Sequence, residues 1–437
     1  MKKTVCIIGK PNVGKSTIFN RLVKDKKAII MDTPGVTRDR IYDTVTYNNK
    51  SFFLIDTGGI EIGHDDFNED IKVQAELAID ESDLILFVVD GKNELDPNDY
   101  LIRDMLIKSH KDVIVVVNKL DNDKRKDNVY NFYELGFEHV YGVSAEHNIG
   151  FKELMDFITS SMNENEEIQD STLKFAIIGR PNVGKSSLIN ALLNEERVIV
   201  SNVAGTTRDA VDTRFNYNGE EYIAIDTAGM RKKGKIYEEI EKYSLIRSLK
   251  AIERSDVCVV VIDANEGIIE HDKHIVSYAT EAGKGIVLVV NKWDTVKNPD
   301  QEIKKWKDLI EAEFQFIPYV KVVFLSAKEK RRIHTLMPEV ISAYENNNKE
   351  VSTSLLNDVI TEAVSMHPAP SYKNQRLKIY FVSQTGVCPP KFTFNVNNKG
   401  LVHFSYERYL ENKIRESFDF SGTPIQLQFK NKNERGE

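Results

Sequence analysis

Two nine-residue stretches of this chain are nearly the same. "GKPNVGKST" begins at Gly9, and "GRPNVGKSS" begins at Gly179, 170 residues later. Four more blocks recur in the same order: "TPGVTRDR" and "VAGTTRDA", "FFLIDTGG" and "YIAIDTAG", "VIVVVNKLD" and "IVLVVNKWD", and "VYGVSAEHN" and "VVFLSAKEK". The spacing changes only between blocks. This ordered recurrence excludes chance, so the chain carries two copies of one domain.

Each copy alternates short apolar runs with amphipathic stretches of helical length. In the first copy the runs are "TVCIIG", "SFFLIDT", "DLILFVVD", "DVIVVVN" and "HVYGVSA". Near-continuous apolar runs are typical of strands that are buried on both faces. Strands that alternate with helices predict a parallel sheet. The fold class predicted for both copies is therefore α/β.

The pattern changes after about residue 350. "TSLLNDVITEAVSM" has helical spacing, "RLKIYFVSQ" and "KFTFNVN" alternate as strands do, "SYERYLENKIRESF" is helical, and "PIQLQF" alternates again. This α-β-β-α-β order predicts a small α+β domain. The stretch "NENEEIQDST" is polar and acidic, which is typical of a linker. The expected organisation is a first domain at 1–162, a linker at 163–172, a second domain at 173–348 and a third at 349–437.

The composition bounds the classes of partner. The net charge of -8 excludes a uniformly basic nucleic-acid coat, so any RNA contact has to come from local basic patches. Cys6 and Cys258 lie inside apolar runs, which predicts buried thiols. The sequence contains neither an 18-residue apolar stretch nor the apolar core of a signal peptide, so we expect a cytoplasmic protein with no membrane partner.

The first block fits G-x-x-x-x-G-K-[ST]. In this motif glycines let backbone N–H groups surround phosphate oxygens beside a helix N-terminus. Lys15 would reach the β- and γ-phosphates of a nucleotide and Ser16 would bind Mg²⁺, and Lys185 and Ser186 repeat these roles. The alternative is a strand–helix turn that needs its glycines for shape alone.

The next two blocks complete a phosphate site. Asp56 and Asp226 end apolar strands, where a carboxylate holds Mg²⁺ directly or through water. Gly59 and Gly229 follow three residues later, where a backbone N–H would approach the γ-phosphate. Loops that order around a γ-phosphate and are released afterwards act as switches. The residues that would close over Mg²⁺ in such loops are Thr37 and Thr207.

The fourth and fifth blocks select the base. Asp121 or Asp294 would accept hydrogen bonds from N1–H and the 2-amino group of guanine. Adenine lacks both donors, and a site built for hydrogen bonds rejects such an analogue by about 10⁴ or more. A surface turn is the alternative for N-K-x-D in isolation. Further base contacts are expected from Asn118 and Asn291 at N7, from the stems of Lys119 and Lys292 over the ring, and from the backbone of Ser144–Ala145 and Ser326–Ala327 at O6.

The expected nucleotide-binding residues form two matched sets. Those of the first copy are Gly9, Lys10, Pro11, Asn12, Val13, Gly14, Lys15, Ser16, Thr17, Asp56, Thr57, Gly58, Gly59, Asn118, Lys119, Asp121, Ser144 and Ala145. Those of the second copy are Gly179, Arg180, Pro181, Asn182, Val183, Gly184, Lys185, Ser186, Ser187, Asp226, Thr227, Ala228, Gly229, Asn291, Lys292, Asp294, Ser326 and Ala327. The catalytic candidates are Asn12, Lys15, Thr37, Gly59, Asn182, Lys185, Thr207 and Gly229. The metal-ligand candidates are Ser16, Thr37, Asp56, Ser186, Thr207 and Asp226.

With these blocks the chain resembles the translation-factor-related GTPases and, more closely, the double-Era-like GTPase family, also called Der or EngA. "GKPNVGKST", "DTPGVTRDR", "DTAGMRKKGKI" and "LVHFSYERYLENKIRE" carry the resemblance across essentially the whole chain. It implies two tandem P-loop GTPase domains followed by a small α+β KH-like domain. It also implies a Mg²⁺-dependent, GTP-hydrolysing switch, monomeric off the ribosome, that binds the rRNA of the large ribosomal subunit and promotes its assembly. A tRNA-modification-type GTPase or another RNA-associated GTPase is the alternative.

The residues that follow the switch glycines are Ile60 and Met230, where many small GTPases have a water-orienting glutamine. Slow intrinsic hydrolysis follows unless another group stabilises the transition state. The resemblance implies K⁺ held by Asn12 and Asn182. The alternative is that each asparagine bonds its own backbone and shapes the loop.

Basic residues are expected to contact RNA. The KH-like segment lacks the G-x-x-G loop that clamps nucleotides, which favours packing against the GTPase domains or backbone contact. The candidates in that segment are Lys391, Lys399, Arg408, Lys413 and Arg415. A second basic cluster follows Gly229, where it would engage rRNA phosphates or an acidic surface such as the switch of the first domain. "KEKRRIH" from Lys328 would extend the basic surface, and either segment could instead be solvated. The residues of the cluster after Gly229 are Arg231, Lys232, Lys233 and Lys235.

Overall fold

The computed structural model describes residues 3–24, 42–48, 50–56, 79, 82–121, 123–160, 172–195, 197–200, 212–225, 241–372 and 375–431. The chain divides into two compact units, Met1–Asp170 and Ser171–Glu437. None of the helices described is long and apolar enough to cross a membrane. Cys6 and Cys258 are buried, as their apolar surroundings predict, and Cys388 is exposed.

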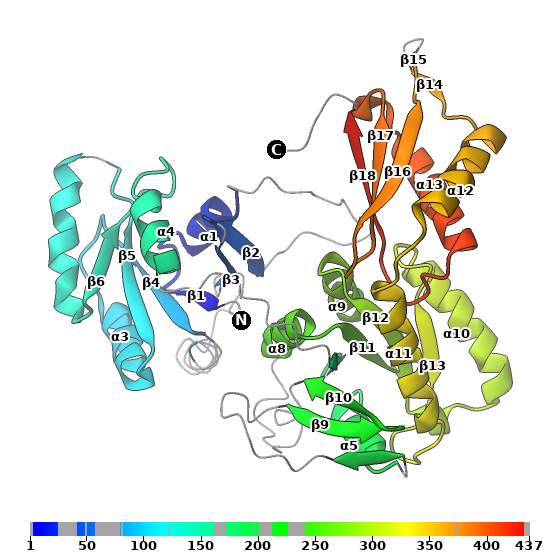
Figure 1. Ribbon diagram of the computed structural model, residues 1–437. Helices are drawn as coiled ribbons and strands as arrows, with labels where there is room; N and C mark the ends of the chain where they lie inside the picture. The colour runs from blue at the N-terminus through cyan, green and yellow to red at the C-terminus, as the bar shows by residue number, and fades with distance from the viewer. Residues whose placement is uncertain are drawn as a thin grey trace. The chain divides into compact units, whose positions relative to one another are not determined.

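The first unit contains a six-stranded sheet in the order β2-β3-β1-β4-β5-β6 (Figure 1). All neighbouring strands are parallel except β2 and β3, which form an antiparallel pair. Helices α1 and α4 contribute to one hydrophobic cluster with one face of this sheet. The strands are β1 (Thr4–Ile8), β2 (Tyr42–Tyr47), β3 (Lys50–Asp56), β4 (Leu84–Asp90), β5 (Asp112–Asn118) and β6 (His139–Gly142). The helices are α1 (Lys15–Lys24), α3 (Pro97–Ser109), η2 (Asp123–Leu135) and α4 (Phe151–Ser160).

The second unit begins with a sheet of the same design, in the order β13-β12-β11-β7-β10-β9-β8 (Figure 1). The apolar runs predicted to be buried on both faces are so, since every residue of β11 and β12 is buried. Helices α5 and α11 share one cluster with this sheet, as α1 and α4 do in the first unit. The strands are β7 (Leu173–Ile178), β8 (Val198–Val200), β9 (Thr213–Tyr217), β10 (Glu220–Ile225), β11 (Val257–Asp263), β12 (Gly285–Asn291) and β13 (Lys321–Phe324). The helices are α5 (Lys185–Leu193), α8 (Glu241–Arg254), α9 (Glu270–Glu281), η3 (Trp293–Thr295), α10 (Pro299–Glu313), η4 (Ile333–Thr335) and α11 (Leu336–Asn347).

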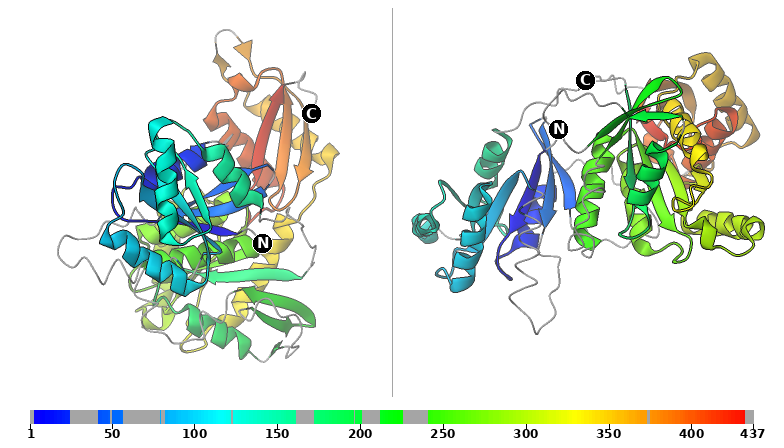
Figure 2. Two further views of the ribbon diagram at one scale, coloured as in Figure 1. Left: turned by 90° about the vertical axis from the view of Figure 1, so that its left-hand side faces the viewer. Right: turned by 90° about the horizontal axis from the view of Figure 1, so that it is seen from below.

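The C-terminal segment confirms the predicted α-β-β-α-β order. Helices α12 and α13 cover one face of the sheet β16-β17-β18, as Figures 1 and 2 show. Phe392, Phe394 and Val396 share the buried face predicted from their alternation, and each is 0% exposed. A short pair of strands, β14 and β15, was not expected. The elements are α12 (Thr353–Met366), β14 (Ser371–Tyr372), β15 (Gln375–Arg376), β16 (Ile379–Gly386), β17 (Lys391–Val396), η5 (Lys399–Leu401), α13 (Phe404–Ser417) and β18 (Gln426–Asn431).

The turn between α13 and β18 joins the C-terminal segment to the second copy of the repeated domain. The backbone of Gly422 accepts from the N–H of Ile286 at 2.7 Å and donates to the carbonyl of Tyr319 at 2.7 Å. The Arg415 guanidinium lies 4.0 Å from the centre of the Tyr319 ring. Arg408 donates to a backbone carbonyl of the same copy. These two arginines therefore serve the packing role that was one of the alternatives for the basic residues of this segment.

Candidate functional site

The turn after the first strand of each copy leaves no room for a side chain. A Cβ atom on Gly9 would lie 2.3 Å from the carbonyl oxygen of Val88, and one on Gly179 would lie 2.6 Å from that of Val261. Both carbonyls belong to the neighbouring strand, β4 or β11, so they cannot move aside. The chain passes closely over these strand ends, as a backbone that surrounds phosphates must.

Glycine is also required where the same loop meets α1 and α5. Gly14 and Gly184 have φ angles of +94° and +97°, which lie in the region that favours glycine. A Cβ atom there would lie 2.3 Å from Nδ2 of Asn118 in the first copy and of Asn291 in the second. Backbone conformation and available space therefore demand the same residue.

The lysines of these loops rest on the loops' own carbonyl oxygens. Lys15 Nζ donates to the carbonyl oxygens of Gly9 and Lys10, both at 2.8 Å. Lys185 makes the two equivalent bonds at 2.7 and 2.5 Å. Burial lowers the pKa of Lys15, and the nearby Asp56 carboxylate opposes that change. An ammonium group held by carbonyls beside a helix N-terminus can exchange them for phosphate oxygens, so both loops fit a nucleotide.

The asparagines of the N-K-x-D blocks connect two loops that are distant in sequence. Asn118 Nδ2 donates to the carbonyl oxygen of Val13 at 2.9 Å, and Asn118 Oδ1 accepts from the backbone N–H of Ala145 at 3.1 Å. Asn291 makes the two matching bonds in the second copy, at 2.8 and 3.0 Å. Each amide thus joins the phosphate loop to the loop predicted to contact the base. Its second N–H stays available for guanine N7.

The carboxylates predicted to read guanine are each fixed by a serine. Ser144 Oγ donates to Asp121 Oδ1 at 2.8 Å, and Ser326 Oγ donates to Asp294 Oδ1 at 2.5 Å. These serines were predicted to lie near the base and to contact it through their backbone. The structure adds that their hydroxyl groups orient the carboxylates.

The two carboxylates differ in one partner. Lys92 Nζ lies 2.6 Å from the second oxygen of Asp121. The hydrogen bond from Lys92, followed by that from Ser144, lowers the pKa of Asp121. Asn265 stands at the matching position of the second copy, and no cation among the described residues forms an ion pair with Asp294. Lys92 was not predicted as a site residue, because it lies between the blocks that the two copies share.

Two further aspartates hold the lysines of the N-K-x-D blocks. Lys119 Nζ is 2.7 Å from Asp90, and Lys292 Nζ is 2.5 Å from Asp263. Burial favours a higher pKa for both carboxyl groups, but the hydrogen bonds from the lysines and from nearby backbone N–H groups outweigh it and lower the pKa. Asp90 and Asp263 were not predicted as site residues, although they end matching apolar runs at the same spacing as the asparagines.

The second residue of each phosphate loop forms ion pairs at the helix that follows the neighbouring strand of the sheet, which is α3 after β4 or α9 after β11. Lys10 Nζ lies 2.5 Å from Asp96 and 2.8 Å from Asp99, at the start of α3. Arg180 Nε lies 2.9 Å from Asp272, which is 0% exposed in α9. These side chains anchor the loop, so their contribution to a nucleotide is limited to their backbone groups.

The predicted metal ligands are placed beside these loops where the structure describes them. Ser16 and Ser186 lie in the first turns of α1 and α5. Asp56 ends β3, is 4% exposed, and pairs in register with Ile7 of β1 next to the phosphate loop. The expected residues that lie outside the described part of the chain are Thr37, Thr57, Gly58, Gly59, Ile60, Thr207, Asp226, Thr227, Ala228, Gly229, Met230, Arg231, Lys232, Lys233 and Lys235.

Comparisons with known proteins identify the family. The model described as "50S ribosome-binding GTPase" matches residues 4–119 and 174–292, and the model of the KH-domain-like C-terminal part of EngA GTPases matches residues 350–430. The chain is 52% identical over 434 residues to GTPase Der of Staphylococcus aureus strain Newman, which covers 99% of this chain and 100% of the relative. The chain belongs to the Der family of GTPases. It is therefore a GTP-hydrolysing enzyme that binds guanine nucleotide.

Solved structures give a weaker likeness. The Era GTPase of Aquifex aeolicus, solved with GDP and aluminium fluoride, is 22% identical and covers 59% of this chain and 92% of its own, with a TM-score of 0.31. The assignment to the Der family rests on the sequence identity and the family models.

Proposed function

We propose that this Der-family chain is a GTP-driven switch with two separate guanine-nucleotide sites. The observation that carries the proposal is the matched asparagine bridge, because Asn118 and Asn291 tie the phosphate loop to the base loop in the same way in both copies. A copy that had lost its function would have no reason to keep this arrangement. The domains proposed are GTPase domains at 1–162 and 173–348, a linker at 163–172 and a KH-like domain at 349–437.

The proposal is tested by counting nucleotides. We expect two guanine nucleotides for each chain at saturation. Asp121→Asn and Asp294→Asn should each move one site from guanine to xanthine nucleotides, because the amide donates where the carboxylate accepts. A single nucleotide at saturation, or equal uptake of adenine nucleotides, contradicts the two-site proposal.

The chain's own groups are arranged to hold phosphates and Mg²⁺. Lys15 and Lys185 would leave their loop carbonyls for the phosphates, and Ser16, Ser186 and Asp56 would hold the metal ion. Bound Mg²⁺ supplies positive charge that offsets the charge on the phosphoryl group. No cluster of three His, Cys, Asp or Glu side chains in the described ranges could hold a metal by itself. This fits a Mg²⁺ site that depends on nucleotide phosphates for part of its ligands.

Asn12 and Asn182 support K⁺ stimulation over a purely structural role. Both have a left-handed backbone, with φ of +65° and +63°. Both side chains are exposed, and neither has a hydrogen-bond partner among the residues that the structure describes. The alternative in which each side chain bonds its own loop backbone requires such a bond, whereas the left-handed backbone by itself is one that asparagine adopts with little strain and fits either role. GTP turnover should therefore be faster in KCl than in NaCl. Asn12→Ala combined with Asn182→Ala should remove the difference. Equal rates in the two salts for the unaltered chain exclude the proposal.

The cellular partner proposed is the large ribosomal subunit, which places the protein in the cytoplasm. Support comes from the matching family model, described as a 50S ribosome-binding GTPase, and from the KH-like domain. Cosedimentation with purified subunits in GTP, in GDP and in a nonhydrolysable analogue tests it. Association with the large subunit in one nucleotide state is the expected result, and absence of association in all three states would refute the proposal.

A further inference from the structure

A short loop of the second GTPase domain carries a concentration of cations. Residues 328–334, "KEKRRIH", connect the Ser326–Ala327 base loop to α11 through η4. The matching loop of the first domain, "EHNIGFK" at 146–152, begins with the negatively charged Glu146 where the second domain has Lys328. The chain as a whole has a net charge of -8, so this loop departs from the overall balance. We call residues 328–334 the basic loop.

Two cationic residues of the basic loop have a strained backbone conformation. Lys330 and Arg332 have φ of +52° and +60°, a left-handed conformation that is strained for residues other than Gly, Asn and Asp. The first domain places Asn148 and Gly150 at the matching positions, with φ of +57° and +78°. Those residue types adopt this conformation with little strain. The second domain thus keeps two long cationic side chains where shape alone favours Asn and Gly.

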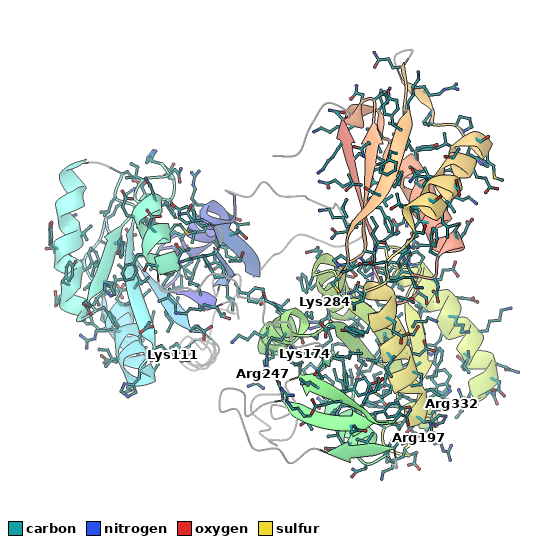
Figure 3. All side chains as sticks on the ribbon, in the orientation of Figure 1. Lys111, Lys174, Arg197, Arg247, Lys284 and Arg332 are labelled. Atoms are coloured by element: carbon teal, nitrogen blue, oxygen red, sulfur yellow. The ribbon has the colours of Figure 1, made fainter. Side chains whose placement is uncertain are left out.

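These cations are free to meet a partner. The side chains of Lys328, Lys330, Arg331 and Arg332 are all exposed, and none forms an ion pair within the described ranges. Arg197 extends the basic surface at the same end of the domain, where Figure 3 labels it beside Arg332. A hollow of about 380 Å³ lies next to the basic loop. It is lined by Asn194, Glu195, Arg197 and His334.

The basic loop is connected directly to the predicted guanine site. Ser326 and Arg331 exchange two backbone hydrogen bonds, at 3.1 and 3.0 Å. Ser326 Oγ accepts from the backbone N–H of Glu329 at 3.1 Å and donates to Asp294 at 2.5 Å. One hydroxyl group therefore links the loop backbone to the carboxylate that would read the base. A ligand that moves the loop backbone can therefore change the position of that carboxylate through Ser326.

We propose that the basic loop and Arg197 bind the phosphates of single-stranded RNA, and that this binding is coupled to nucleotide in the second GTPase site. The inference rests on the proposed function and names the residues that would contact ribosomal RNA. An RNA fits better than an acidic protein because the adjacent hollow offers both ring and hydrogen-bonding groups. His334 and Arg197 can stack on an unpaired base, and Asn194 and Glu195 can bond its edge. Coupling of the two sites is reciprocal, so RNA changes guanine-nucleotide affinity as much as nucleotide changes RNA affinity.

The test replaces the two strained cations by the residues of the first domain. Lys330→Asn with Arg332→Gly removes two charges and relieves the backbone, so the full-length variant should be at least as heat-stable as the original chain. Binding of a 20-nucleotide single-stranded RNA should weaken about 10–30-fold in 0.1 M salt, and the salt dependence of log Kd should fall by about 1.4, since each lost phosphate contact contributes about 0.7. The control, Lys304→Gln with Lys307→Gln, removes two exposed charges from α10 and should change neither value.

The coupling is read through intrinsic fluorescence. Both tryptophans of the chain, Trp293 and Trp306, belong to the second GTPase domain, and Trp293 lies inside its N-K-x-D block. Titration with GDP should give a second-site affinity that saturating RNA changes at least threefold in the original chain. The change should be lost in the Lys330→Asn, Arg332→Gly variant. No effect of RNA on the original chain overturns the coupling.

The outcomes separate this proposal from the proposed function. If the variant binds RNA as tightly as the original chain with the same salt dependence, or if poly-glutamate competes as well as RNA does, the loop assignment is wrong even where the chain cosediments with large subunits. If the original chain does not cosediment with large subunits but the variant binds RNA more weakly than the original chain, the loop assignment stands and the ribosomal proposal fails. Should the first variant lose heat stability, Lys328→Gln with Arg331→Gln provides an independent charge removal, with the same expected loss of affinity.

Discussion

Replacement of Asn291 by Ala should destabilise the second GTPase domain before any nucleotide is added. The amide donates to the carbonyl of Val183 at 2.8 Å and accepts from the N–H of Ala327 at 3.0 Å, and both bonds are buried. A buried polar group left without its partner costs about 1–3 kcal/mol, so two such groups cost about 2–6 kcal/mol. We expect the lower half of this range, because water entering the pocket would partly replace the lost bonds.

Urea unfolding followed by tryptophan fluorescence measures this loss in the intended domain. Trp293 and Trp306 are the only tryptophans of the chain, and both lie in the second GTPase domain. The Asn291→Ala variant should unfold at a lower urea concentration than the original chain, both without nucleotide. Asn118→Ala removes the same bridge from the first domain and is the matched control, so the tryptophan transition should not move.

The competing explanation is that Asn291 only contacts guanine N7. It predicts weaker nucleotide binding with an unchanged unfolding transition of the nucleotide-free protein. The bridge predicts a lower unfolding midpoint of the nucleotide-free protein in addition to weaker GDP binding. Asn291→Asp adds a second comparison, because it keeps the acceptor for Ala327 and loses the donor to Val183. An unfolding midpoint that does not change in Asn291→Ala refutes the bridge as a source of stability.

Three further substitutions test other parts of the structure. Gly9→Ala places a Cβ atom 2.3 Å from the Val88 carbonyl oxygen, so we expect loss of nucleotide from the first site and a lower melting temperature by calorimetry. Lys92→Ala removes a partly exposed ion pair from Asp121, and such pairs contribute about 0.2–1 kcal/mol. The affinity of the first site for GDP should therefore rise up to about fivefold. Calorimetric titration of a chain whose second site is disabled measures this change. Arg415→Ala should loosen the KH-like domain and speed its release by limited proteolysis.

Each of these substitutions has a control that makes a similar change at a residue without the contact under test. Gly136→Ala also meets a backbone penalty, with φ of +78°, but its Cβ atom has nothing within 4 Å, so only a small loss of stability should follow. Lys152→Ala removes an exposed charge from α4 that forms no ion pair with Asp121 and should leave GDP affinity unchanged. Lys413→Ala removes a cation from the same helix as Arg415 without touching the Tyr319 ring, and equal proteolysis of the two variants contradicts the docking role of Arg415.

Much of the fold could be read from local patterns. The two copies were visible as blocks in one order, and the buried strands were visible as apolar runs. The C-terminal order was visible from alternation, with Phe392, Phe394 and Val396 on one face. Such features depend on neighbours within a few residues, so the sequence alone contains them. The short pair β14 and β15 was missed because each strand has only two residues.

The residues of the candidate site were predicted as two matched sets, but the hydrogen bonds and ion pairs between them were not. That Asn118 joins Val13 to Ala145 depends on groups 105 and 27 residues away in the chain. That Lys92 pairs with Asp121 depends on the ends of β4 and β5 lying side by side.

By itself the sequence determined that this protein has two guanine-nucleotide-type domains and a smaller third one, because repeated motifs and residue periodicity are local properties. The tertiary structure alone decided which side chains support those motifs and which differ between the copies. It also showed that Arg415 and the turn at Gly422 fasten the third domain to the second. The physical reason is that hydrogen bonds and ion pairs act over about 3 Å in space, and only the folded chain brings groups that are distant in sequence within that distance.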